Sequence, residues 1–148
     1  MVLLDTDHLS ILEWQDNPAA LRIRTRLQEY SPDEVGTTII NFEEKMRGWM
    51  TILAKTRKVK EHIEAYRRLS QQLRLFCSIS FVLEFDERAA VEFQRLKKEH
   101  PRLGTMDLRM AAIALSHRAT LVSRNQRDFR QIPGLVLEDW TQQDEVTP

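Results

Sequence analysis

Short apolar runs alternate with segments of helical periodicity along the chain, and this alternation predicts most of its secondary structure. The first run, residues 2–5, leads directly into an acidic pair, a pattern typical of a strand buried on both faces. β-Branched and apolar content predicts four more strands, at residues 35–40, 80–85, 119–123 and 135–138. Helical spacing and capping residues predict helices, caps included, at residues 8–14, 17–30, 41–53, 58–76, 86–100 and 105–118. Strands that alternate with helices predict an α/β fold, a parallel sheet covered on both faces.

The two longest predicted helices are also the most basic part of the chain. Nine Lys or Arg residues and two acids lie between Lys45 and Arg74, although the whole chain carries no net charge. One apolar stripe on each helix predicts that the two pair as a hairpin on the sheet. Charge alone favours solvated helix faces here over a surface for a phosphate backbone. The apolar residues exceed what one core-facing stripe requires, and we expect most of the following to be buried in the core: Trp49, Met50, Leu53, Ile63 and Tyr66.

The composition fits a single cytosolic domain. Its 148 residues suffice for one core, and 42% apolar with 30% charged residues is typical of a soluble protein. The single cysteine, Cys77, excludes an internal disulfide and a cysteine-based zinc site. No signal-peptide pattern or membrane-spanning run is found, so we expect a cytoplasmic location and no membrane partner. Residues from about 141 onward are expected to form a flexible tail.

Four acidic residues lie at or near predicted helix starts, beside the carboxyl ends of strands: Asp5, Glu44, Asp107 and Asp128. Each one alone is better explained as a helix cap or as a charge that the helix dipole favours. Right-handed crossovers, however, would bring all four to the same edge of a parallel sheet, where ligands collect. Carboxylates packed this closely repel one another, so the group predicts a bound cation.

Oxygen ligands alone favour Mg²⁺ or Mn²⁺ over zinc, and the histidines show no spacing typical of a zinc site. His8 is therefore expected to be structural. Asp7 either faces the same pocket or caps the first helix, with equal support for both. Periodicity also leaves Glu43 and Glu44 open, although Gly48, one turn further on, leaves room beside Glu44.

Four motifs, in order and at suitable spacing, resemble those of PIN-domain proteins of the VapC type, the toxin halves of bacterial toxin–antitoxin pairs. The first is Leu-Leu-Asp-Thr-Asp-His-Leu-Ser at residues 3–10, and the second is Glu44 with Gly48. The third is Gly-Thr-Met-Asp-Leu at residues 104–108, followed by Ala111 and Ala112. The fourth is Thr-Leu-Val-Ser-Arg-Asn at residues 120–125, followed by Asp128, Phe129, Ile132-Pro133-Gly134 and Glu138-Asp139-Trp140. The resemblance spans nearly the whole chain. The chain departs from the family pattern at Lys45, where an apolar residue is usual, and in the charged segment 100–103.

The resemblance implies one PIN-like nuclease domain over residues 1–148, an α/β/α sandwich with strand order 3-2-1-4-5 that cleaves RNA with Mg²⁺ or Mn²⁺. By position, Asp5, Glu44 and Asp107 match the family's metal-binding acids, and this match selects Glu44 over Glu43. Asp128 or Asn125 matches the variable fourth polar residue. The residues expected to orient water or to bind the substrate are Thr6, Ser123, Arg124, Asn125 and Arg127. Expected partners are single-stranded RNA, a cognate antitoxin and a second copy of the chain.

Two other functions are considered. A PIN-fold domain without catalysis would act by binding a partner, with some of the surplus apolar residues at a dimer or antitoxin surface. A haloacid-dehalogenase-like phosphatase also begins with a strand that ends in Asp-x-Asp, the first Asp being a nucleophile. The phosphatase is the weaker alternative, because its site needs a lysine near a late strand and no lysine follows Lys98.

Overall fold

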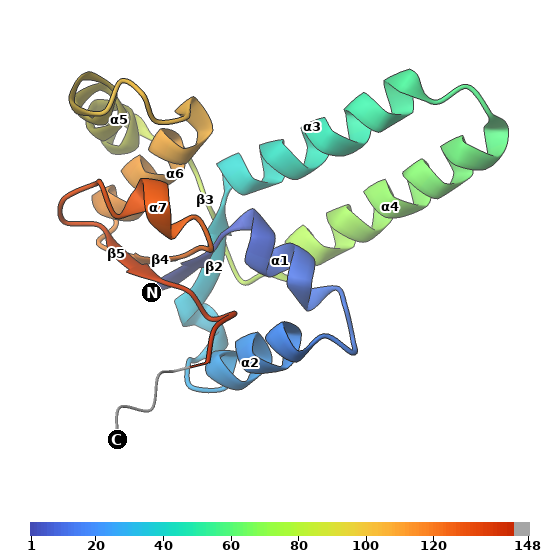
Figure 1. Ribbon diagram of the computed structural model, residues 1–148, viewed down its shortest axis with the longest axis horizontal. Helices are drawn as coiled ribbons and strands as arrows, with labels where there is room; N and C mark the ends of the chain where they lie inside the picture. The colour runs from blue at the N-terminus through green and yellow to red at the C-terminus, as the bar shows by residue number, and fades with distance from the viewer. Residues whose placement is uncertain (144–148) are drawn as a thin grey trace.

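The computed structural model describes residues 1–143 and consists of a five-stranded sheet with helices on both faces (Figure 1). All strand pairs are parallel, in the order β3-β2-β1-β4-β5, which confirms the predicted fold class and strand order. The strands are β1 (Val2–Leu4), β2 (Val35–Thr38), β3 (Val82–Leu83), β4 (Thr120–Val122) and β5 (Val136–Glu138). The helices are α1 (Thr6–Leu12), α2 (Pro18–Leu27), α3 (Ile39–Lys55), α4 (Val59–Ser78), α5 (Glu87–Glu99), α6 (Thr105–Ser116) and α7 (Gln126–Phe129), with a 3-10 turn at Pro32–Glu34. The tail predicted from residue 141 lies largely outside the described residues.

β1 lies in the middle of the sheet, and its side chains enter two separate cores. Val2 and Leu4 point to one face and pack with residues of α1, α2 and α4, among them Ile23 and Phe76. Leu3 points to the other face and packs with residues of α5 and α6. All three strand residues are at most 3% exposed, as the unbroken apolar run predicts. Packing on both faces fixes the position of β1, and with it the position of its carboxyl end at the edge of the sheet.

α3 begins earlier than the sequence predicts, because Thr38 and not Asn41 is its cap. The Thr38 hydroxyl accepts a hydrogen bond from the Asn41 backbone N–H at 3.3 Å, and the Asn41 amide oxygen accepts one from the Thr38 N–H at 3.2 Å. This reciprocal capping ends β2 at Thr38, short of the predicted residue 40. Glu44 therefore has no role in the cap, and the capping explanation for this residue is wrong.

Several helix ends differ from the prediction by two or three residues, and other differences concern α6, β3 and α7. Thr105 is the first residue of α6 and not its cap, which is Gly104, a residue without a side chain to bond the helix. β3 pairs over two residues only, because the sheet extends no further at that edge. α7, a single turn of four residues, was not predicted, since so short a helix shows no apolar periodicity.

The hairpin of α3 and α4 projects away from the sheet and does not lie on it (Figure 1). Its base is buried through Phe76, which packs edge-to-face on Phe42 at 5.1 Å between ring centres. Further out, none of the surplus apolar residues is buried, and Met50, Ile63 and Tyr66 are 55–62% exposed. The predicted core role of these residues is wrong, because periodicity places them on a helix face but does not show where the sheet beneath ends. Within residues 1–143, no helix combines the length and the apolar character that a membrane span requires.

Candidate active site

Asp5 follows β1 and lies at the centre of a hydrogen-bond network. Its Oδ1 atom accepts from the Thr6 backbone N–H at 2.6 Å and from the Asn41 amide at 2.9 Å, and its Oδ2 atom accepts from the Ser123 hydroxyl at 2.5 Å. Burial nevertheless raises the pKa of Asp5 to about 6, against the opposing effect of the Ser123 and Thr6 donors, and the charges of Glu44 and Asp7 add to the rise. A cation beside this carboxylate would stabilise its ionised form.

Glu44 joins the same network from the second turn of α3. One of its carboxylate oxygens accepts from the Thr6 hydroxyl at 2.6 Å, and that hydroxyl in turn accepts from the Asn41 amide at 3.0 Å. Glu43 points elsewhere and pairs with Arg47 at 2.6 Å on the exposed side of the helix. The structure thus places Glu44, and not Glu43, with Asp5.

Asp107 and Asp128 meet across the side chain of Asn125. The Asn125 amide donates to Asp107 at 3.1 Å and to Asp128 at 3.3 Å, and the backbone N–H of Asn125 donates to the Ser123 hydroxyl at 3.1 Å. Burial first, and then the charges of Glu44 and Asp128, raise the pKa of Asp107 to about 6, while the Asn125 amide opposes the rise. Ser123 and Asn125 therefore connect this pair to the carboxylate of Asp5.

Asn41 completes the network, although the sequence indicated only a helix cap at this position. Its amide nitrogen donates to Asp5 and Thr6, while its amide oxygen accepts from Thr38 and from the Thr37 hydroxyl at 3.1 Å. A signal was present, since Asn41 precedes Glu44 by three residues and so lies on the same helix face. Its role was missed because a cap explains an Asn at a helix start equally well.

The remaining predicted site residues lie beside the network rather than in it. Asp7 is exposed in the first turn of α1, and its charge contributes to the raised pKa of both Asp5 and Asp107. The first helix is capped by Asp5, so Asp7 is not the cap. Arg124 and Arg127 are exposed at the edge of the sheet, on either side of Asn125.

The acids are held by neutral donors only. Within residues 1–143, no Lys, Arg or His side chain forms an ion pair with Asp5, Glu44, Asp107 or Asp128. In the same part of the chain, no three His, Cys, Asp or Glu side chains already stand in an arrangement that holds a metal ion. The donor set itself, carboxylate oxygens whose charges oppose one another and lack a basic partner, fits a hard divalent cation.

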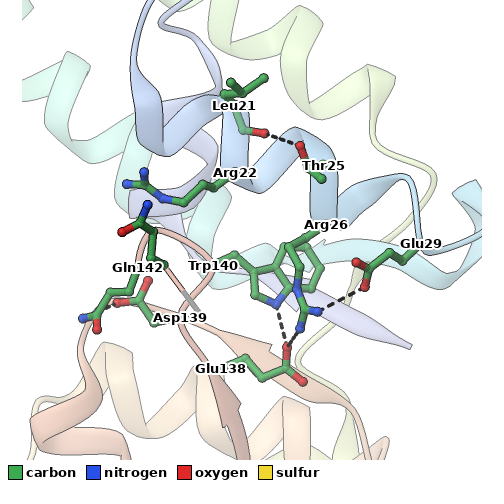
Figure 2. Close-up of a pocket in the computed structure, with 10 residues that line it drawn as sticks. Leu21, Arg22, Thr25, Arg26, Glu29, Glu138, Asp139, Trp140 and Gln142 are labelled. Atoms are coloured by element: carbon green, nitrogen blue, oxygen red, sulfur yellow. Dashed lines mark hydrogen bonds and ion pairs between the residues drawn. The ribbon is translucent and has the colours of Figure 1, made fainter. Parts of the chain in front are cut away.

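A cleft of about 900 Å³ lies away from these acids, between α2 and the residues that follow β5 (Figure 2). Arg26 spans it, pairing with Glu138 at 3.0 Å and lying over the Trp140 ring at 5.7 Å. The buried His8 ring accepts from the Trp140 backbone N–H at 3.2 Å, and burial lowers the pKa of His8 to about 4. These contacts fix the segment from Glu138 to Trp140 on the fold, so His8 is structural, as expected.

Comparisons with known proteins agree with the geometry. The PIN domain family matches residues 2–135. Ribonuclease VapC2 of Rickettsia felis is 32% identical over 73 residues, which cover 47% of this chain and 54% of that protein. The tRNA(fMet)-specific endonuclease VapC of Salmonella typhimurium is 36% identical over 69 residues, 44% of this chain and 52% of that protein.

The chain thus spans about half the length of the curated relatives that it matches. The chain is similar to the crystal structure of DNA-bound VapBC from Salmonella typhimurium, with a TM-score of 0.69 and 25% identity over 94% of this chain and 97% of that one. The match over residues 2–135 establishes the family, and the protein belongs to the PIN domain family.

Proposed function

We propose that this protein is a metal-dependent ribonuclease, the toxin of a toxin–antitoxin pair. The observation that carries the proposal is the convergence of carboxylates from four separate segments at one edge of the sheet, without a basic side chain to neutralise them. Burial and, to a smaller extent, the neighbouring charges raise the pKa of both Asp5 and Asp107, so a bound cation would favour their ionised forms. The names of the curated relatives, a ribonuclease and an endonuclease, support the same reaction class.

Asp5, Glu44, Asp107 and Asp128 would hold Mg²⁺ or Mn²⁺ in this site. A bound divalent ion activates water and neutralises charge that develops on a phosphodiester during hydrolysis. Four neutral side chains orient the carboxylates through the hydrogen bonds described above: Thr6, Asn41, Ser123 and Asn125. Arg124 and Arg127 are assigned to the phosphate backbone of the substrate, since both are exposed beside the site.

The substrate is proposed to be single-stranded RNA, because a duplex restricts the angles from which its backbone reaches a site at a sheet edge. A cognate antitoxin, a second copy of the chain and a cytoplasmic location complete the proposal. The exposed apolar residues of the hairpin, among them Met50, Ile63 and Tyr66, support a protein partner on that surface. The VapBC complex among the structural neighbours and the free thiol of Cys77 are consistent with these assignments.

Cleavage of a defined single-stranded RNA by the purified chain, with Mg²⁺, with Mn²⁺ and with EDTA, tests the proposal. We expect cleavage that requires the metal and that is lost in Glu44→Gln but retained in Glu43→Gln. The two variants form a matched pair, since each removes one charge from neighbouring positions of α3 and only Glu44 joins the network. RNA binding without cleavage in either metal would favour the non-catalytic alternative. Hydrolysis of a generic phosphomonoester in place of RNA would favour the phosphatase.

A further inference from the structure

Gly48 has no structural explanation among residues 1–143. It lies inside α3 with an ordinary helical backbone, and a Cβ atom added there would meet no other atom of these residues within 4 Å outside the adjacent backbone. Two other glycines are required by the fold: a Cβ at Gly36 would collide with the Phe81 ring, and Gly134 has a positive φ of 81°. Glycine is among the least favourable residues inside a helix, so something other than helix stability or packing explains Gly48.

The position of Gly48 connects it to the acidic site. It follows Glu44 by one helical turn, so the two residues share a face of α3. Glu44 points toward the acids, because it bonds Thr6 and its charge raises the pKa of Asp107. A side chain at Gly48 would therefore project beside the route by which a large substrate reaches those acids.

The same face continues as a defined strip along α3. Thr51 and Lys55 follow Gly48 at helical spacing, and all three residues are exposed. We call the surface formed by Glu44, Gly48, Thr51 and Lys55 the α3 strip. At 1.5 Å of rise per residue, the strip extends about 17 Å from Glu44 to Lys55.

The charges along the hairpin favour a nucleic-acid strand as the occupant of the α3 strip. Nearer the base, Lys45, Arg47, Arg67 and Arg68 are paired with acids of this chain. In contrast, Lys55 has no acidic partner among residues 1–143, and the same holds for the cations that continue around the turn of the hairpin, Arg57, Lys58 and Lys60. Unpaired cations at one end attract phosphates, and a divalent cation held by the carboxylates would do the same at the other end, with bare backbone between them.

We propose that single-stranded RNA runs from the acidic site along the α3 strip, passes against the bare backbone at Gly48 and places phosphates near Lys55. The inference rests on the proposed ribonuclease function and assigns the substrate a path on the same site. At about 3.4 Å per phosphate in a stacked strand, the strip accommodates about five phosphates. Gly48 acts as a positioning residue, since its missing side chain lets the backbone of the substrate approach the helix.

The first test compares Gly48→Leu with Ala54→Leu, an equally bulky change at an exposed position on another face of α3. Cleavage of a fluorescein-labelled single-stranded RNA is measured with Mn²⁺. We expect Gly48→Leu to lower kcat/KM by about tenfold or more, mainly through KM, and Ala54→Leu to leave it unchanged. Gly48→Ala provides the structural control. It should raise Tm by about 3 °C through helix propensity while still weakening cleavage, a combination that a purely structural role of the glycine does not give.

The second test measures RNA affinity in EDTA as a function of salt for Lys55→Gln and for Lys98→Gln, an equal charge change on α5. We expect the slope of log affinity against log salt to fall by about 1 for Lys55→Gln and to stay unchanged for Lys98→Gln. If the native chain cleaves RNA and Gly48→Leu cleaves equally well, the path is wrong and the ribonuclease stands. If the native chain neither binds nor cleaves RNA, both proposals are wrong. Full cleavage by Gly48→Leu with loss of a co-expressed antitoxin would assign the strip to the protein partner.

Discussion

The acidic edge of the sheet and the α3–α4 hairpin differ in how their polar groups are satisfied. At the edge, buried carboxylates are bonded by neutral donors from distant parts of the chain, and burial raises the pKa of Asp5 and Asp107. On the outer hairpin, exposed cations and apolar residues have few partners within the described chain. The proposed function assigns a small cation to the first region and a large partner to the second.

The largest effect is expected at the centre of the acidic edge. Asp5→Asn keeps the shape of the side chain, and its oxygen still accepts from Thr6 and Asn41 while its amide donates to the Ser123 hydroxyl. We expect RNA cleavage to fall by about 10³-fold, because one charged ligand for the cation is lost. Gel analysis of cleavage products measures this effect. Retention of activity above a tenth of the native rate would remove Asp5 from the mechanism.

Within the hairpin, the buried base and the exposed face should respond very differently. Phe76→Ala removes a ring that is 5% exposed and packed on Phe42, and should lower the free energy of unfolding by about 3–5 kcal/mol. Tyr66→Ala, at a residue 62% exposed, should change it by less than about 0.5 kcal/mol. Urea denaturation of both variants provides the measurement. A large loss of stability in Tyr66→Ala would mean that the outer hairpin is packed against something in solution.

Asn41 belongs to both regions, because it lies in the first turn of α3 and bonds Asp5. Asn41→Ala should destabilise the fold by about 1–2 kcal/mol and lower cleavage by about 10–100-fold. Asn17→Ala removes the cap of α2, whose side chain accepts from the Ala19 N–H at 2.8 Å, and serves as the control. It should cause a similar loss of stability without loss of specific activity. Equal activity in the two variants would limit the role of Asn41 to its hydrogen bonds with the α3 cap, Thr38.

The smallest effect is a dependence of stability on pH. Folding raises the pKa of Asp5 from 3.8 to about 6, so between these values the native state binds more protons than the unfolded state. In EDTA, the combined contribution of Asp5 and Asp107 to the free energy of unfolding should therefore fall by at least about 1 kcal/mol as pH rises from 4 to 6, whereas His8, whose pKa is lowered, contributes in the opposite direction.

Thermal unfolding in EDTA across this pH range, for the native chain and for Asp5→Asn, measures the effect. The fall in the free energy of unfolding should be smaller in Asp5→Asn, because this variant lacks one of the two acids whose pKa is raised by folding. Added Mn²⁺ should restore stability to the native chain above pH 6. An equal fall in both chains would assign the pH dependence to other groups.

The sheet and the meeting of the acids followed from the sequence because both depend on local patterns. A buried strand reads as an apolar run, and right-handed crossovers bring the residues that follow parallel strands to one edge. For this reason the sequence predicts that Asp5, Glu44, Asp107 and Asp128 lie at one edge of the sheet. The role of Asn41 did not follow, since a helix-start Asn is explained by capping unless the neighbouring strand is seen. The pairing of α3 and α4 as a hairpin is predicted correctly. The exposure of its apolar residues, such as Tyr66, is not, because periodicity does not show where the sheet ends.

The reciprocal bonds between Thr38 and Asn41 make the base of α3 a pivot. The helix extends about 24 Å from Ile39 to Lys55, and a tilt of about 5° around the pivot would displace the far end by about 2 Å but Glu44 by well under 1 Å. A molecule that binds at the turn between α3 and α4 therefore acts about 24 Å from the base of α3. A force applied there would act on the base of α3, where the Asn41 amide is the contact between this helix and the Asp5 carboxylate.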